Sequence, residues 1–256
     1  MLAVLDLFSV DQPVWKADEV AASFKCSVAT AYRYLAELCR AGLLTRTSSA
    51  FTLGARIVEL DYTIRQSDPL RRAALPIMRE LRDRTGCDVL LADMIGDRIL
   101  ASHHERGNDP TTVSFGRGRP MPLFRGAGSK AIIATLPVAR LRRMYNARQD
   151  EIAGAGLGDD WKGFRAALAA IRRAGHAISL GELEPQNVAV GAPVSHGEGA
   201  APGSLVLVLS RARWGIADKT VVAALVETAA ARIGAAAWDD SAMVESIEAI
   251  RASRAF

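Results

Sequence analysis

Residues 27–42 read SVATAYRYLAELCRAG, and this stretch decides the fold of the first part of the chain. Ser27 is a suitable N-cap, because its hydroxyl can accept a hydrogen bond from the free amides of a first helical turn. Gly42 stands where a helix commonly ends with a left-handed residue. Four apolar residues between them share one face at helical spacing: Val28, Ala31, Leu35 and Leu38. The stretch therefore predicts an amphipathic helix between Ser27 and Gly42.

The opposite face of this helix is small near its N-terminal end and then becomes basic and aromatic. A helix that enters the major groove of DNA by its N-terminal end must be slim there, because bulky side chains would hold it out. Arg33 can reach a guanine edge, and Thr30 can bind a base or a phosphate. We predict that this face contacts DNA through Ser27, Ala29, Thr30, Tyr32, Arg33 and Arg40.

The flanking residues complete a DNA-binding module. Apolar residues at helical spacing predict two earlier helices, one around residues 3–8 and one around residues 18–24. Two helices joined by a tight turn form a helix-turn-helix. Residues 43–46 and 51–53 then predict a hairpin, a wing. Its polar tip suits contact with phosphate or the minor groove through Arg46, Thr47, Ser48 and Ser49.

Composition limits the other possibilities. The chain has 256 residues, of which 50% are apolar, so it can form two domains with cores. The net charge of +4 is mild support for a polyanionic partner. Residues 1–60 hold six Lys or Arg and six Asp or Glu, so DNA binding there depends on the placement of charge. Three helices and a hairpin could also contact only protein; the slim helix face and basic tip favour DNA.

A connecting helix and a second domain follow. Residues 55–66 predict a helix, which ends at Ser67 and Asp68, and Pro69 fits the first position of the next helix. Beyond Gly86, strands are expected at 88–94, 98–103, 112–115, 177–180, 187–194 and 204–210. Helices are expected at 126–135, 138–145, 161–174 and 218–238, with another from about 241. Glycine-rich loops are expected at 154–158 and 196–203. Strands flanked by helices without strict alternation indicate an α+β fold.

Several stretches resemble the IclR family of bacterial regulators, and together they span nearly the whole chain. They are VLDLF (4–8), TAYRYL (30–35), FTLGAR (51–56), EL (59–60), MPL (121–123), GAGSKA (126–131), GHA (175–177), ELEP (182–185) and NVAVGAPV (187–194). The resemblance implies a winged helix-turn-helix (1–54), a linker helix that helps to dimerise the DNA-binding domains (55–68), and a GAF-like effector-binding domain (69–256). That last domain would be an antiparallel sheet flanked by helices. The chain departs from the family at Val28 and Ala29, where lysine and serine are common, and at Phe124 and Arg125, where a histidine and a small residue are usual.

The resemblance also implies an effector pocket between the start of the 126–135 helix and residues 182–190. A helix start rich in glycine offers backbone amides to an anion, and the Arg125 guanidinium suits a carboxylate. This predicts a small organic acid as effector, aromatic acids included. Arg125 could equally be a surface residue and Ser129 a helix cap, and sheet packing would also explain Leu90 and Ser102. The candidate contacts are Leu90, Ser102, Leu123, Arg125, Gly126, Ala127, Gly128, Ser129, Glu182, Asn187, Val188 and Ala189.

Catalytic, metal and cofactor sites are not expected. The stretch GAGSK lacks the spacing of a phosphate loop. His103 and His104 are adjacent on a predicted strand and so point to opposite faces. The three cysteines are too widely spaced for a disulfide framework or a zinc site. Without a signal peptide or a membrane-length apolar run, the chain is expected in the cytoplasm.

These features predict a ligand-responsive transcriptional regulator and not an enzyme. It would bind a partly palindromic double-stranded DNA operator as a homodimer or a dimer of dimers, without a membrane partner. The alternative is a small-molecule-binding protein or an enzyme whose N-terminal domain makes protein contacts only.

Overall fold

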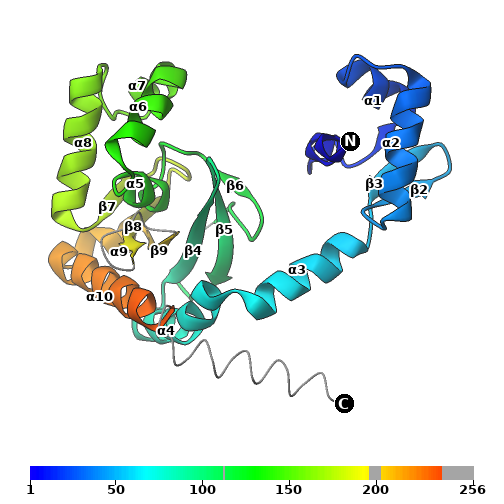
Figure 1. The fold of residues 1–256 in the computed structure, drawn as a ribbon. Coiled ribbons are helices and arrows are strands. Elements are labelled where there is room, and N and C mark those ends of the chain that lie inside the picture. The colour runs from blue at the N-terminus through cyan, green and yellow to red at the C-terminus, as the bar shows by residue number, and fades with distance from the viewer. Residues whose placement is uncertain (112, 196–202, 238–256) are drawn as a thin grey trace. The chain divides into compact units, whose positions relative to one another are not determined.

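The computed structural model describes residues 1–111, 113–195 and 203–237 (Figure 1). Contacts divide the chain into two compact units, Met1–Asp68 and Pro69–Phe256. Each unit has a hydrophobic core of its own, built around Leu35 in the first and around Val226 and Phe164 in the second.

The first unit is a helix-turn-helix with a wing. Its elements are η1 (Leu2–Leu7), β1 (Trp15–Lys16), α1 (Ala17–Ser23), α2 (Val28–Arg40), β2 (Leu44–Thr47), β3 (Ala50–Leu53) and α3 (Arg56–Ser67). The first predicted helix is a short 3-10 helix, η1. Strand β1 was not expected from the sequence; it pairs Trp15 with Phe51 and completes an antiparallel sheet in the order β1-β3-β2.

Helix α2 is bounded by the residues that its sequence indicates. The Ser27 hydroxyl accepts a hydrogen bond from the Thr30 amide at 3.2 Å. Gly42 has a φ of +73°, a backbone angle that residues with a side chain rarely adopt. Ala31, Leu35 and Leu38 are buried against η1, α1 and the sheet, as predicted for the apolar face. Val28 was assigned to the same face but is 46% exposed, because it lies at the open N-terminal end.

The base of the wing is a close backbone crossing. The Gly54 amide donates to the Leu43 carbonyl at 2.8 Å, and the Arg56 amide to the Gly42 carbonyl at 3.3 Å. A Cβ on Gly54 would lie only 2.1 Å from the Gly42 carbonyl oxygen. Only glycine therefore fits where β3 leads into α3.

Helix α3 buries none of its own residues. Its exposed apolar side chains are Val58, Leu60, Tyr62 and Ile64. Surface ion pairs join Arg56 to Glu59 and Arg65 to Asp61 along the helix.

The second unit is a six-stranded antiparallel sheet in the order β6-β5-β4-β9-β8-β7, flanked by helices (Figure 1). Its elements are α4 (Pro69–Thr85), β4 (Asp88–Ile95), β5 (Arg98–Glu105), β6 (Pro120–Met121), α5 (Ala127–Ile133), α6 (Val138–Ala147), α7 (Gln149–Gly154), α8 (Trp161–Ala174), β7 (Ala177–Leu180), β8 (Asn187–Val194), β9 (Gly203–Ser210), α9 (Arg211–Ile216) and α10 (Lys219–Ala237). The fold class predicted from the sequence is confirmed.

Both faces of the sheet are covered. Helices α4 and α10 pack on one face, where Leu91, Val190 and Leu207 are fully or almost fully buried. Helix α5 packs on the other face against β8 and β9. Helix α10 is long and apolar enough to span a membrane by length and composition alone. One of its faces, which includes Val226 and Ile233, is buried in the core of this unit, and 44% of the apolar window is buried.

One expectation for this unit needs correction, two helices were not expected, and two predicted segments are not tested. Residues 113–115 form no strand; the edge strand is β6, which pairs with β5. The Ser114 amide donates to the Glu184 carboxylate at 3.0 Å, so its acceptor is a side chain and not a neighbouring strand. Helices α7 and α9 were not expected. The predicted helix from 241 and residues 196–202 of the predicted loop lie outside the described residues.

Candidate functional site

The exposed face of α2 carries the side chains predicted to contact DNA. Ala29, Tyr32, Arg33 and Arg40 are exposed, whereas Thr30 is half-buried. The Thr30 hydroxyl lies 2.9 Å from the Ser27 hydroxyl, so these two side chains also cap the helix. Near the slim end, Arg33 lies over the Tyr34 ring, with its guanidinium carbon 5.7 Å from the ring centroid. Arg40 pairs with Glu37 at 2.6 Å, which offsets its charge.

The wing presents the second predicted contact surface. Its exposed side chains are Arg46 and Thr47 at the end of β2 and Ser48 and Ser49 in the turn between β2 and β3. Ser48 has a φ of +54°, and its carbonyl accepts a hydrogen bond from Arg46 Nε at 3.1 Å. The basic side chain is thereby held beside the hydroxyl groups of the tip.

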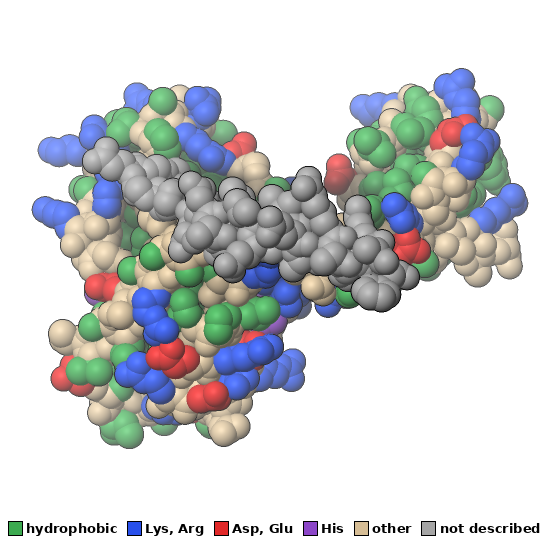
Figure 2. Space-filling model, turned by 60° about the horizontal axis from the view of Figure 1, so that its bottom comes forward, with side chains coloured by type: hydrophobic (Ala, Val, Ile, Leu, Met, Phe, Trp, Pro, Cys, Tyr) green, Lys and Arg blue, Asp and Glu red, His purple; other side chains and the backbone are tan. Residues whose placement is uncertain are grey.

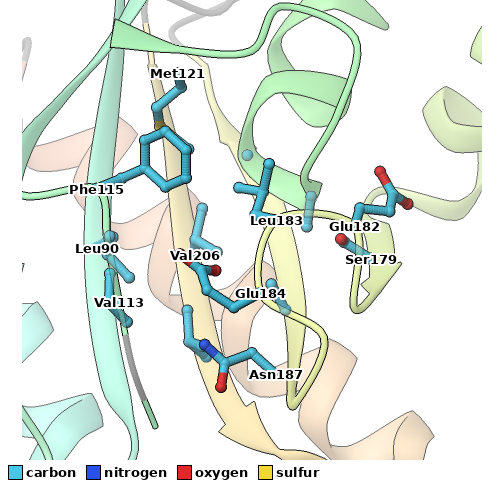
Figure 3. Close-up of a pocket in the computed structure, with 14 residues that line it drawn as sticks. Leu90, Val113, Phe115, Met121, Ser179, Glu182, Leu183, Glu184, Asn187 and Val206 are labelled. Carbon is cyan, nitrogen blue, oxygen red and sulfur yellow. The ribbon is translucent and has the colours of Figure 1, made fainter. Parts of the chain in front are cut away.

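The second unit contains a small, mostly apolar pocket on the α5 side of the sheet (Figure 3). The strap of residues 113–121 and the turn of residues 181–186 enclose it. Its lining consists of Leu90, Val113, Phe115, Met121, Ala127, Gly128, Ser179, Glu182, Leu183, Glu184, Asn187, Ala189, Val206 and Val208. The free volume is about 40 Å³, so a ligand larger than a few water molecules must displace lining side chains.

The start of α5 lies at this pocket and binds a carboxylate from the protein's own side chains. The Gly126 amide donates to Glu182 Oε2 at 3.0 Å, and Lys130 Nζ donates to Glu182 Oε1 at 2.6 Å. Lys130 is buried. The Glu182 carboxylate therefore occupies the position at which a helix N-terminus attracts negative charge.

Glu184 belongs to the same turn but plays a different part. Its Oε1 accepts the Ser114 amide at 3.0 Å and so ties the turn to the strap. In Figure 3 its carboxyl group points into the lining beside Val206, whereas that of Glu182 points away from Leu90 and Phe115. The two carboxylates thus differ in orientation as well as in partners.

A close approach of α5 to the sheet shapes the pocket floor. A Cβ on Gly191 of β8 would lie 2.8 Å from the Ala127 carbonyl carbon, and one on Gly128 would lie 2.7 Å from Val206 Cγ2. These small residues let the first turn of α5 lie directly on β8 and β9, where Ala127 and Gly128 reach the pocket.

Residues 63–235 match the family model described as the C-terminal domain of the bacterial transcriptional regulator IclR. This match covers more than half of the chain. The chain belongs to the IclR family. Proteins of this family are transcriptional regulators that bind DNA and small-molecule effectors, and they are not enzymes.

Similar proteins cover most of this IclR-family chain. It is 24% identical to the HTH-type transcriptional regulator KipR of Bacillus subtilis (strain 168) over 214 residues, 83% of this chain and 85% of KipR. A crystal structure of an IclR-type regulator from Silicibacter sp. TM1040 matches with a TM-score of 0.77 at 20% identity, over 92% of this chain and 94% of that one. An IclR homologue from Microbacterium hydrocarbonoxydans, crystallised with 4-hydroxybenzoate, matches with a TM-score of 0.74 at 21% identity, over 92% and 96%. At these identities the structures show a shared fold.

Half of the predicted effector contacts of this IclR-family chain line the pocket: Leu90, Ala127, Gly128, Glu182, Asn187 and Ala189. The remaining six do not: Ser102, Leu123, Arg125, Gly126, Ser129 and Val188. Arg125 is exposed and donates to the Gly154 carbonyl at 3.0 Å. Leu123 is buried in the core beside α6 and α8, and Val188 in the core under α4 and α10.

Of the other three residues outside the lining, two make hydrogen bonds elsewhere and one does not. The Ser102 hydroxyl donates to the Leu91 carbonyl at 3.2 Å, and the Gly126 amide donates to the Glu182 carboxylate. Ser129 is fully buried, and its hydroxyl has no partner within the described residues; it does not cap α5. In the ligand-free structure Arg125 is thus a surface residue, the alternative that the sequence left open, and Ser129 is neither a cap of α5 nor part of the pocket lining.

The lining residues missed by sequence reasoning come mainly from the strap and from β9. Val206 and Val208 alternate with core residues Leu205 and Leu207, so strand periodicity could have placed them on the α5 face. Val113 and Phe115 alternate like residues of a strand but belong to none, and Met121 lies in β6, whose two residues are too few to show a period.

The two adjacent histidines on β5 pair with separate carboxylates. His103 Nε2 lies 2.9 Å from Glu105 Oε1, and His104 Nε2 lies 3.1 Å from Asp88 Oδ2. Burial lowers the pKa of His103, and the neighbouring Glu105 only partly offsets this. Both rings are largely buried. Within the described ranges, no group of three or more potential ligands could hold a metal ion.

Proposed function

We propose that this chain recognises an operator through α2 and the β2–β3 wing and responds to a small molecule bound in the α5 pocket. The observation that carries the proposal is the exposed, slim N-terminal face of α2, with Arg33 beside it and a hydroxyl-rich basic wing after it. Such a helix fits the major groove while the wing reaches the backbone.

The proposed DNA-binding form is a homodimer or a dimer of dimers. Helix α3 exposes Val58, Tyr62 and Ile64 and buries none of its residues, so it has apolar surface to offer a second copy. Two-fold symmetry would then place two recognition helices in successive major grooves, about 34 Å apart.

The pocket supports a small, largely apolar effector. Acidic compounds were expected from Arg125 and the start of α5, and the Microbacterium homologue was crystallised with an aromatic acid. In this chain, however, Arg125 and the Gly126 amide have partners within the protein. Of the groups on which the prediction of an acidic effector depended, the amides of Ala127 and Gly128 lie at the pocket lining.

Arg33→Ala tests the recognition face directly. We expect discrimination between specific and random DNA to fall by about 10- to 100-fold, because a bidentate arginine–guanine contact contributes about 1–3 kcal/mol. Fluorescence anisotropy with the chain's own upstream DNA and a scrambled duplex, over several salt concentrations, measures this. Unchanged discrimination would remove Arg33 from the interface.

Arg46→Ala, on the wing, serves as the comparison. We expect it to weaken binding to both duplexes alike and to reduce the slope of affinity against salt by about one, as loss of a phosphate contact does. If wild-type protein formed no specific complex at low salt, operator binding itself would be refuted.

A further inference from the structure

We propose that a second ligand site lies between α6 and the turn that joins β4 to β5, and that it binds a small molecule with a phosphate monoester group. The site goes beyond the proposed function, because it is separate from the operator-binding face and from the α5 pocket, with which its lining shares no residue. The proposal follows from the charges, the partners and the shape of this hollow, which is called the α6 hollow below.

The α6 hollow is large enough for a small ligand. Its free volume is about 300 Å³, against about 40 Å³ for the α5 pocket, and sites for small molecules begin at about this size. Leu123 and Met144 form an apolar floor and are almost fully buried. A compact molecule can therefore enter without displacing lining side chains.

Three arginines of the lining come from α6 and its C-terminal end. Arg140 and Arg143 lie three residues apart on the helix and are therefore neighbours on its surface, and Arg148 follows the last turn. No Asp or Glu occurs between residues 138 and 148. Like charges at this spacing destabilise a helix, and a bound anion would offset that repulsion.

The guanidinium groups keep donors for a ligand. Arg140 binds the β4–β5 turn through Nη2, which lies 3.0 Å from Asp97 Oδ1, so its other nitrogens remain available. Arg148 lies 3.5 Å from Glu151, a carboxylate that is 57% exposed, and such surface pairs are weak. Arg143 has no partner within the described residues. An anion in the hollow can therefore bind Arg143 without displacing a protein group.

The charge of the hollow matches a phosphate monoester. Three arginines and Asp97 leave two net positive charges in the lining. A phosphate monoester carries about −1.5 to −2 charges at pH 7 and presents three acceptor oxygens, and guanidinium groups bind such oxygens in bidentate pairs. A carboxylate or a sulfate ester carries a single charge. The apolar floor suits the part of the ligand that carries the phosphate group.

The arginines at the surface of α4 and α10 are arranged differently. Arg232 binds both oxygens of Glu80, at 3.1 and 2.8 Å, and Arg84 lies 3.5 Å from the same carboxylate. Figure 2 shows basic and acidic side chains side by side on this part of the second unit. Carboxylates neutralise the arginines there, whereas the three arginines of the α6 hollow share one lining carboxylate.

The first test compares phenyl phosphate with phenyl sulfate, which share a ring and differ in charge. Isothermal titration calorimetry on the full-length protein measures both Kd values at equal ionic strength. We expect phenyl phosphate to bind at least tenfold more tightly, because only its charge matches that of the lining. Equal affinities for the two esters, or no binding of phenyl phosphate at millimolar concentration, would overturn the proposal.

Variants assign the binding to the α6 hollow. Because Arg143 has no protein partner, Arg143→Ala should leave the unfolding temperature of the ligand-free protein unchanged and raise the Kd of phenyl phosphate at least tenfold. Arg173→Ala removes an arginine that is also exposed but lies on α8 outside the lining, and it should change neither quantity. An unchanged Kd in Arg143→Ala, or an equal rise in both variants, would show that phenyl phosphate binds elsewhere, for instance in the α5 pocket.

The phosphodiesters of DNA are another source of phosphate, and a duplex of random sequence distinguishes them. Each phosphodiester carries one charge and is part of a double helix too wide to enter the hollow. Arg143→Ala should therefore bind the random duplex as the wild type does. Weaker binding of the duplex by Arg143→Ala than by Arg173→Ala would make this face a contact for DNA and would contradict the assignment to a small molecule.

Discussion

Glu182→Ala should destabilise the second unit by roughly 3 kcal/mol, since removing one partner of a buried ion pair costs about 3–5 kcal/mol. The side chain of Lys130 is 10% exposed and that of Glu182 is 25% exposed, which places the expected loss near the lower end of that range. The variant would leave the Lys130 ammonium and the Gly126 amide without their acceptor. Thermal unfolding of the full chain measures the loss.

The same variant should become sensitive to acetate. The missing side chain leaves a space beside two anion donors, and acetate bound there would stabilise the native state by about 1.4 kcal/mol at ten times its Kd. The measurement is the unfolding temperature in sodium acetate against sodium chloride at equal ionic strength. Wild-type protein and Glu151→Ala should respond alike to the two salts. An identical response of Glu182→Ala would show that the start of α5 is not an anion site.

The elements predicted best from the sequence are those whose bounds depend on residues close to them in the chain. Ser27 and Gly42 mark the two ends of α2, and both act through backbone hydrogen bonds or dihedral angles of nearby residues. The expected bounds of α8, β7 and β8 coincide with the observed ones, because periodicity and flanking turns define them.

The secondary structure was predicted wrongly where it depends on residues that are distant in the sequence. Strand β1 has only two residues, and it exists because Trp15 and Lys16 pair with Phe51 and Ala50. The alternation of Val113, Ser114 and Phe115 resembles a strand, yet it reflects two side chains that line a pocket and an amide that binds Glu184. Alternation of apolar and polar residues shows that one side of a segment is buried. A strand also requires hydrogen bonds to a neighbouring strand.

The candidate pocket shows the same limit. Glycines at the start of a helix correctly indicate a place for an anion, and Gly126 does donate its amide to one. The acceptor is Glu182, 56 residues further along the chain, so the spacing of the motif could not reveal that the protein fills this place itself. Arg125 stands next to the motif in sequence, but its side chain binds the end of α7.

Gly54→Ala should weaken the first unit and DNA binding together. The new Cβ would lie 2.1 Å from the Gly42 carbonyl oxygen and 2.9 Å from the Gly42 carbonyl carbon, both in the backbone. Relief requires the base of the wing to separate from the end of α2, at the expense of the Gly54–Leu43 hydrogen bond. We expect a loss of about 1–3 kcal/mol, the usual cost of overpacking, and operator affinity lowered with it, because α2 and the wing no longer hold their relative positions.

Calorimetry and anisotropy on the full chain check this expectation. The second unit has its own core, so stabilisation by a pocket ligand should persist in Gly54→Ala while specific DNA binding declines. Gly215→Ala is the matched control, since a Cβ there meets nothing within 4 Å and φ is not positive. If Gly54→Ala unfolded and bound DNA like Gly215→Ala, the backbone crossing at the base of the wing would not be what fixes the wing against α2, and the wing would have to be positioned by the β1–β3 pairing alone.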